Sequence, residues 1–369
     1  MRVLFVSKPL APPWNDGSKN LARDVASRLV RARATVLTTP NAPPIPRRTG
    51  APVDAEAIYR DAGRFTPALS ANARVFARLV TDRDHDAWHF FFAPNPASSA
   101  AARVARAVRR FGGPVLQTVA SAPRDFARAP RLLFGDRVIA LSRWTREKLA
   151  AAGADARRLV VIPPCAPAPR PDEGAARRAR ERAGVPEGAP IVLFPGDYEV
   201  STGARTVAAA TAAIVRAVPE ARVVFACRPK SPRAALAKDA LAASLGEHAK
   251  YTHHAGEVPD MAGLLAATSV VAFPVDDPWG KVDVPLVLLE ALALGVPMVL
   301  ASGGPLEEVE TARFVPPRDP GRLAEAVVAV LKGGGGDAAA GRALWRARFS
   351  PDVVAAAHDD LYDDVRRAK

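Results

Sequence analysis

Short apolar runs alternate with longer alanine-rich stretches along most of this chain, and few folds accommodate that order. The short runs have the length of strands, and the alanine-rich stretches have the length of helices. The order is typical of parallel βαβ units and not of β-sandwiches or helical bundles. In the first half we expect helices at residues 18–33 and 97–110 and strands at 3–6, 35–38, 87–92, 115–119, 138–141 and 159–162.

The alternation stops at a proline-rich segment and then starts again. Five of the nine residues at 163–171 are prolines, which excludes regular helix or interior strand and predicts a linker. Beyond it we expect strands at 191–195, 223–227, 270–273 and 299–301, with helices at 203–218, 234–245 and 287–294. The chain should therefore be an α/β protein of two similar halves, 1–166 and 167–350, facing each other across a cleft. Residues 351–369 carry a helical apolar stripe that should pack on one of them.

The composition excludes several other classes of protein. Hydrophobic residues make up 49% of the 369 residues and charged residues 24%, which is enough apolar material for two cores. The two cysteines, Cys165 and Cys227, cannot form a disulfide-dense scaffold or a four-cysteine zinc site. The apolar run at 3–6 is shorter than a signal-peptide core, and no stretch approaches the roughly 18 apolar residues of a membrane-spanning helix. We expect a cytoplasmic protein, and peripheral contact with the inner membrane face stays open.

The formal net charge is +13, and a general bias towards arginine accounts for part of it. An anionic ligand, an anionic membrane surface or nucleic acid would account for the rest. The sequence has no interleaving of aromatic and basic residues of the ribonucleoprotein type, no zinc-finger spacing and no basic heptads. We therefore expect no nucleic-acid partner.

Loops that follow parallel strands are the places where ligands collect, and three of them carry candidate anion-binding groups. The first, at 7–19, holds Gly17, Ser18 and Lys19, whose amides would attract an anion; a capped helix start with nothing bound is the alternative. The second, at 195–203, has two glycines but neither the dinucleotide nor the P-loop fingerprint. The third carries Arg228 and Lys230, which suit a phosphate or form an exposed basic turn.

The most informative segment is 281–308, where Glu290 stands among apolar residues one turn into an expected helix. A carboxylate in such a place is costly to bury without a partner. A sugar diol would supply that partner, whereas a bridge between structural elements is the alternative.

This segment resembles the signature of retaining glycosyltransferases of the GT-B fold, in family 4, also called glycosyl transferases group 1. Leu289-Glu290-Ala291 and Gly295-Val296-Pro297 match the signature, and the Gly303-Gly304 turn follows it. The resemblance implies two Rossmann-like domains, with the closing helix crossing back to the first, acceptor-side domain. It also implies a nucleotide-diphosphate sugar as donor, bound by the second domain, with Glu290 holding the ribose. The residues expected around the donor are Gly17, Ser18, Lys19, Gly196, Arg228, Lys230, Leu286, Glu290, Gly303 and Gly304.

The chain departs from the signature at four positions. Val282 stands where the first glutamate of the signature belongs, Asp197 and Thr202 replace an arginine and a lysine for the diphosphate, and Ala120 replaces a histidine. Pro285 also removes a backbone donor. Lysines and arginines in the strand-end loops, Lys8, Lys19, Arg228, Lys230 and Lys281, could restore the lost charge.

Lys281 and Asp283 lie where the transferred sugar would lie, so they are the candidate catalytic residues. The resemblance then implies transfer to an acceptor hydroxyl with retained configuration, without metal or cofactor. The acceptor is a glycan, a lipid-linked sugar or a small molecule. A non-catalytic GT-B protein that binds a nucleotide sugar or a partner transferase is the alternative, and a nucleotide-sugar epimerase is a third interpretation.

Overall fold

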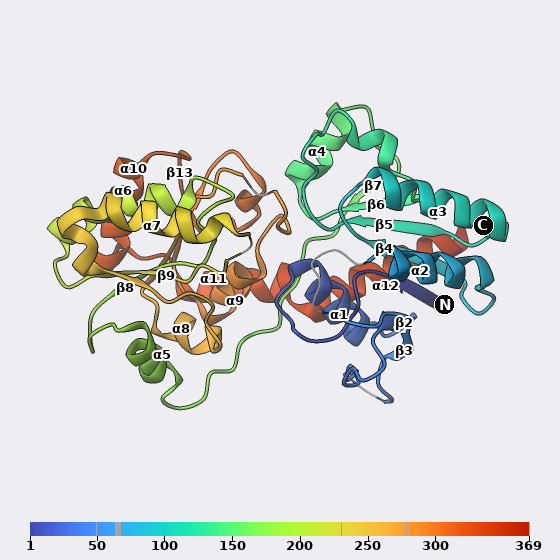
Figure 1. Cartoon of the computed structure of the whole chain (residues 1–369), viewed down its shortest axis with the longest axis horizontal. Helices are drawn as coiled ribbons and strands as arrows, with labels where there is room; N and C mark the ends of the chain where they lie inside the picture. Colours follow the sequence, from blue (N-terminus) through green and yellow to red (C-terminus); the bar gives the residue numbers. More distant parts are fainter. Residues whose placement is uncertain (49, 63–67, 230, 278, 369) are drawn as a thin grey trace. The chain divides into compact units, whose positions relative to one another are not determined.

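The computed structural model describes residues 1–48, 50–62, 68–229, 231–277 and 279–368. The chain divides into two compact units (Figure 1). The N-terminal unit contains Met1–Ala166, Trp279–Leu286 and Arg348–Lys369, and the C-terminal unit contains Pro167–Pro278 and Val287–Ala347. Residues 279–286 thus pack with the N-terminal unit, whereas the sequence analysis placed them inside the domain at 167–350. No helix in the described part of the chain is both long and apolar enough to cross a membrane.

The N-terminal unit is built on a seven-stranded parallel sheet in the order β3-β2-β1-β4-β5-β6-β7. Its strands are β1 Arg2–Val6, β2 Arg33–Thr38, β3 Asp54–Ala57, β4 Ala87–Phe91, β5 Val115–Val119, β6 Arg137–Ala140 and β7 Leu159–Val161. Its helices are α1 Gly17–Arg28, α2 Leu69–Thr81, α3 Pro96–Arg109, the 3₁₀ turn η1 Ala129–Leu132, α4 Arg143–Ala151 and α12 Pro351–Arg367. The expected parallel α/β class is confirmed. The short edge strand β3 has too few apolar residues to be predicted from the sequence.

Helices cover both faces of this sheet, so its central strands β4 and β5 are buried along their whole length. Alternate side chains of β1 separate into two cores: Val3 and Phe5 pack towards α1 and α12, and Leu4 packs towards α2 and α3. The closing helix α12 brings Leu361 and Tyr362 into the first of these cores. Helix α12 packs in this core because its apolar stripe, predicted at 351–369, faces the sheet.

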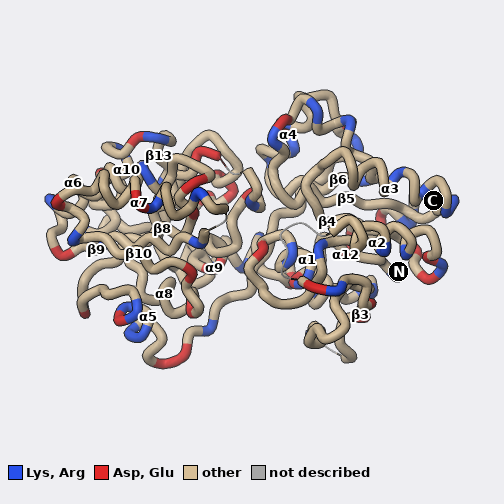
Figure 2. The backbone as a smooth tube through the Cα atoms, viewed as in Figure 1, with Lys and Arg blue, Asp and Glu red and all other residues tan. Residues whose placement is uncertain are grey.

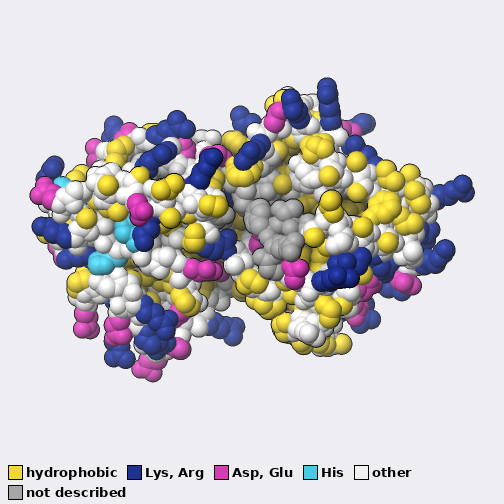
Figure 3. Space-filling model, in the orientation of Figure 1, with side chains coloured by type: hydrophobic (Ala, Val, Ile, Leu, Met, Phe, Trp, Pro, Cys, Tyr) yellow, Lys and Arg dark blue, Asp and Glu magenta, His cyan; other side chains and the backbone are white. Residues whose placement is uncertain are grey.

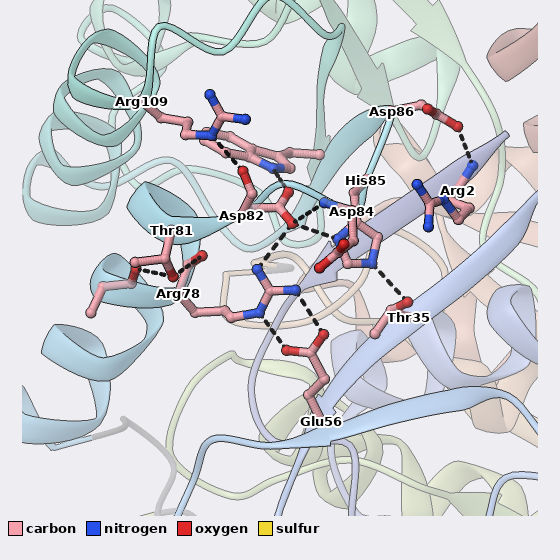
Figure 4. A network of polar contacts seen from close by, with 12 residues as sticks. Arg2, Thr35, Glu56, Arg78, Thr81, Asp82, Asp84, His85, Asp86 and Arg109 are labelled. Carbon is pink, nitrogen blue, oxygen red and sulfur yellow. Dashed lines mark hydrogen bonds and ion pairs between the residues drawn. The ribbon is translucent and has the colours of Figure 1, made fainter.

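A polar network holds one end of the same sheet together (Figure 4). The carboxylate of Asp82 accepts hydrogen bonds from Arg78 at 2.9 Å, from His85 at 2.8 Å and from the Trp88 indole at 2.7 Å. Burial raises the pKa of Asp82, but these hydrogen bonds outweigh burial and leave the pKa well below its usual value. Arg78 also pairs with Glu56 of β3, so the network ties α2 to the edge strand.

The C-terminal unit has a six-stranded parallel sheet in the order β10-β9-β8-β11-β12-β13. Its strands are β8 Ile191–Phe194, β9 Arg222–Phe225, β10 Thr252–His254, β11 Val270–Phe273, β12 Met298–Ala301 and β13 Arg313–Val315. Its helices are α5 Ala175–Ala183, α6 Gly203–Ala217, α7 Arg233–Leu245, α8 Met261–Ala267, α9 Leu286–Leu294, α10 Pro320–Ala329 and α11 Ala338–Leu344. Shorter turns are η2 Gly246–Tyr251, η3 Pro305–Glu308, η4 Val330–Gly334 and η5 Trp345–Phe349.

Each sheet reverses its strand order at one place, between β1 and β4 in the first unit and between β8 and β11 in the second. In open parallel sheets such a reversal leaves a crevice beyond the carboxyl ends of the two strands, where ligands bind. The loops that follow these strands therefore position the candidate site in each unit.

Candidate functional site

In the loop after β1, an aspartate of the loop itself accepts hydrogen bonds from the backbone amides at the start of α1. Asp16 caps α1, and its Oδ1 accepts hydrogen bonds from the amides of Ser18 at 3.0 Å and Lys19 at 3.2 Å. The other carboxylate oxygen pairs with Lys8 Nζ at 2.6 Å. Burial raises the pKa of Asp16, but the charge of Lys8 and the hydrogen bonds outweigh burial and lower it. The amides of Ser18 and Lys19, expected to attract an anion, are therefore held by an internal carboxylate.

Lys19 is the cation that this arrangement leaves available. Its side chain is only 3% exposed, and Nζ lies 5.5 Å from the centroid of the Trp14 ring. Burial lowers the pKa of its ammonium group, the charge of Asp16 opposes that effect and the charge of Lys8 adds to it. Among the described residues no carboxylate lies within ion-pair distance of Nζ. A bound anion would supply the missing partner.

Residues 279–286, here called the bridging segment, are attached to the N-terminal unit at three points. The Trp279 ring lies under the guanidinium of Arg124, at 3.8 Å from the ring centroid. Val282 is 5% exposed in the core beside α1, where a Cβ added to Gly17 would lie 3.4 Å from its two γ carbons. Gly17 is therefore the close-contact point of α1, and Leu286 also packs against this core.

The third attachment is Asp283, which is fully buried. Its Oδ2 accepts a hydrogen bond from Ser142 Oγ at 2.5 Å, and the same hydroxyl oxygen accepts from the amide of Thr145 at 3.0 Å in the first turn of α4. This geometry favours an anchoring role for Asp283 over the catalytic role expected from the sequence. Lys281, the other candidate catalytic residue, is half-buried in the same segment.

In the loop after β8 in the C-terminal unit, carboxylates also accept hydrogen bonds from backbone amides. A Cβ on Gly196 would lie 2.4 Å from the Phe194 ring, so this close turn requires glycine. Asp197, 1% exposed, accepts a hydrogen bond from the amide of Val200 at 3.0 Å. The arginine of the family signature is thus replaced here by a buried acid.

Asp276, which follows β11, holds the backbone at the start of α6. Its Oδ1 accepts from the amide of Thr202 at 2.9 Å, and its Oδ2 pairs with Arg318 Nε at 2.7 Å. Burial raises the pKa of Asp276, but these hydrogen bonds outweigh burial and lower it. No local pattern signals this pair, because Arg318 is 42 residues away in the chain.

The remaining predicted residues lie at neighbouring strand ends of the same unit. Glu290 is half-buried on α9, and Arg228 is half-buried after β9. The amide of Gly303, in the left-handed region at φ +79°, donates to Glu307 Oε1 at 2.7 Å, and Gly304 follows it before η3. Lys230 lies outside the described residues. A diphosphate at these strand ends must displace an internal carboxylate or bind to side-chain cations.

His89 and His254 are both hydrogen-bonded to tyrosine hydroxyls. His89 is fully buried on β4, with Nδ1 bonded to the Tyr362 hydroxyl at 2.7 Å and Nε2 to Thr118 Oγ1 at 2.8 Å. His254 Nδ1 is bonded to the Tyr198 hydroxyl at 2.8 Å. Within the described ranges, no group of three or more His, Cys, Asp or Glu side chains could hold a metal ion.

The fold of the chain matches known structures along its whole length. HepE of Anabaena, solved with UDP-glucose, superposes with a TM-score of 0.73 at 17% identity, covering 100% of both chains. Sucrose-phosphate synthase of Thermosynechococcus elongatus gives 0.76 at 21% identity, also over 100% of both. The chain has the GT-B fold. This confirms the fold expected from the glycosyltransferase signature.

The sequence comparisons cover parts of this GT-B chain. Residues 189–333 match the model of the family described as Glycosyl transferases group 1, which includes the signature at 285–307. A D-inositol 3-phosphate glycosyltransferase of Xylanimonas cellulosilytica is 32% identical over 250 residues, which are 63% of this chain and 58% of that protein. The matched region thus spans a little over half the length of this relative.

Proposed function

We propose that this protein is a glycosyltransferase that moves a sugar from a nucleotide-diphosphate sugar to a hydroxyl group of an acceptor. The observation that carries the proposal is the match of residues 189–333 to glycosyl transferases group 1, since this region includes Glu290 and the strand-end loops of the second sheet. The structural relative HepE was solved in complex with UDP-glucose, which supports a nucleotide sugar as donor.

In this proposal Glu290 accepts hydrogen bonds from the ribose hydroxyls of the donor. The bond between the sugar C1 and the diphosphate oxygen breaks, and a new bond forms from C1 to the acceptor oxygen with retained configuration. The acceptor hydroxyl gives its proton to the leaving diphosphate oxygen. Negative charge grows on the leaving diphosphate, so fixed cations at the strand ends stabilise the transition state. We assign that role to Arg228, which follows β9 in the same unit as Glu290, and assign no step to a metal ion or cofactor.

A thermal-shift screen with UDP, GDP, ADP and TDP tests donor binding. A nucleotide at 100 times its dissociation constant should add about 2.7 kcal/mol of stability. We expect one nucleotide to give a clear shift, and Glu290→Gln to lose that shift while its own melting temperature stays close to the parent value. Glu325→Gln is the matched control, because that carboxylate is 68% exposed on α10 of the same unit. Equal shifts in the parent and in Glu290→Gln would remove the ribose assignment.

A second function is favoured by one observation: four acids, Asp16, Asp197, Asp276 and Glu307, accept hydrogen bonds from backbone amides in three strand-end loops. A GT-B protein that binds a nucleotide sugar without transferring it would have no need of cations for a leaving group. Product analysis separates the two functions. Release of nucleotide diphosphate in the presence of acceptors, starting with D-inositol 3-phosphate from the name of the relative, supports the transferase. Donor binding without release supports the non-catalytic protein.

A further inference from the structure

The net positive charge of the chain comes from one of its two units. The N-terminal unit contains 32 Lys and Arg against 18 Asp and Glu, whereas the C-terminal unit contains 19 against 20. A general bias towards arginine would give both units a similar net positive charge. The separation therefore indicates that a cationic N-terminal unit serves a purpose of its own.

On this unit, α3 exposes an apolar stripe. Its inner face packs on the sheet through Ser99, Ala102 and Ala105, which are buried. Its outer face carries Val104 and Val108, one turn apart and 50% and 60% exposed. The exposed Ala97 and Ala101 continue the same line towards the start of the helix. Hydrophobic side chains gather in Figure 3 at the place where Figure 1 labels α3.

Arginines border this stripe, and α3 has no acidic residue in its sequence. Arg103 and Arg110 are exposed, and Figure 2 marks Lys and Arg along this helix. Arg103 is held in place because its guanidinium donates to the carbonyls of Arg131 and Leu133. Arg110 ends the helix in the left-handed conformation at φ +50°.

We propose that the α3 face of the N-terminal unit binds the surface of an anionic lipid bilayer. Val104 and Val108 enter the headgroup region, and Arg103 and Arg110, which lie seven residues apart along one flank of the stripe, contact lipid phosphates. A nucleic acid would also attract the arginines, but its phosphate backbone gains little from aliphatic side chains. The apolar stripe beside the arginines is the feature that favours the bilayer. The proposal does not depend on the glycosyltransferase activity.

Flotation of the full-length chain with lipid vesicles tests this proposal. We expect binding to vesicles of phosphatidylcholine mixed with phosphatidylglycerol, little binding to phosphatidylcholine alone, and weaker binding as salt is raised. The double variant Val104→Asn/Val108→Asn should bind at least about tenfold more weakly, because it removes the inserting side chains. Arg110→Asn should weaken binding about fivefold, and asparagine tolerates the left-handed conformation.

The matched control is Val30→Asn/Leu236→Asn, which removes two exposed aliphatic side chains, 78% and 73% exposed, that lie after α1 and on α7. This variant should float like the parent. Val104→Thr/Val108→Thr keeps the shape of both side chains and repeats the test should the asparagine variant melt at lower temperature. Two results would overturn the proposal: no flotation with anionic vesicles, or unchanged flotation of the Val104/Val108 double variants and of Arg110→Asn. Tighter binding to duplex DNA than to anionic vesicles, equal in parent and variants, would show a nucleic-acid surface instead.

Discussion

At the scale of single residues, Asp24 is an acid in a place that disfavours its charge. It is 7% exposed on α1, where Oδ1 pairs with Arg23 at 2.7 Å and Oδ2 has no hydrogen-bond partner in the described structure. Burial raises the pKa of Asp24 to about 6, although the charges of Arg23 and Arg28 oppose that shift. Between the unfolded value near 3.8 and this folded value, the folded chain holds more protons than the unfolded chain.

Asp24→Asn should therefore stabilise the protein relative to the parent, and increasingly so as pH rises from 4 to 7. The gain at pH 7 should reach at most about 3 kcal/mol, less what is lost with the Arg23 pair. Denaturant titrations at pH 4, 5, 6 and 7 measure this difference. A constant difference for Asp24→Asn would contradict the raised pKa.

At the scale of elements, two contacts from distant parts of the sequence complete the N-terminal unit. The bridging segment is anchored by Asp283 on Ser142, and α12 is anchored by Asp359. The Asp359 carboxylate, 2% exposed, accepts hydrogen bonds from three successive amides between α1 and β2: Val30 at 2.8 Å, Arg31 at 3.1 Å and Ala32 at 2.8 Å. One carboxylate of α12 therefore holds the backbone of the turn between α1 and β2.

Asp359→Ala should lower the free energy of unfolding by roughly 3 kcal/mol, because it leaves backbone donors unpaired beside the α12 helix. Asp360→Ala provides the neighbouring control: its side chain is 70% exposed and pairs with Arg31 on the surface. Its loss should change the free energy of unfolding only slightly, because the pair is exposed to water and screened by salt. Urea denaturation of the three proteins makes the comparison, and equal losses would show that the three amide bonds contribute little.

At the scale of the whole molecule, buried histidines of the N-terminal unit make its stability depend on acid. Burial lowers the pKa of His358 to about 4, and burial followed by the nearby His358 lowers that of His89 well below 6.5. The unfolded chain therefore takes up more protons than the folded chain once the pH falls below 6.5. The raised pKa of Asp24 makes the folded chain take up more protons instead, but this single group is outweighed by the two histidines.

The melting temperature should consequently fall steadily as the pH drops from 6.5 to 4, and calorimetry at four pH values would measure the slope. His358→Gln should reduce this slope, since its amide stays neutral across the range, whatever the variant does to stability at pH 7. A melting temperature that stays constant between pH 6.5 and 4 would contradict the neutral, buried state of the two histidines.

The sequence alone determined the parallel α/β class, the linker at 163–171 and the GT-B fold that the solved structures confirm. These depend on apolar periodicity, proline content and a contiguous motif, all of which are local along the chain. Glu290 and the glycine of the Gly196 turn were identified for the same reason. The sites remain predictions, because no contact in the structure tests what they bind.

Only the tertiary structure decided what the charged groups of the strand-end loops contact. Asp283 is buried on Ser142, 141 residues away, and Asp276 pairs with Arg318, 42 residues away. The packing of Val282 beside Gly17 likewise joins the bridging segment to the first unit and not to the second. A sequence pattern records which residues are apolar or charged, but the partner that satisfies a buried charge is chosen by chain packing across such distances.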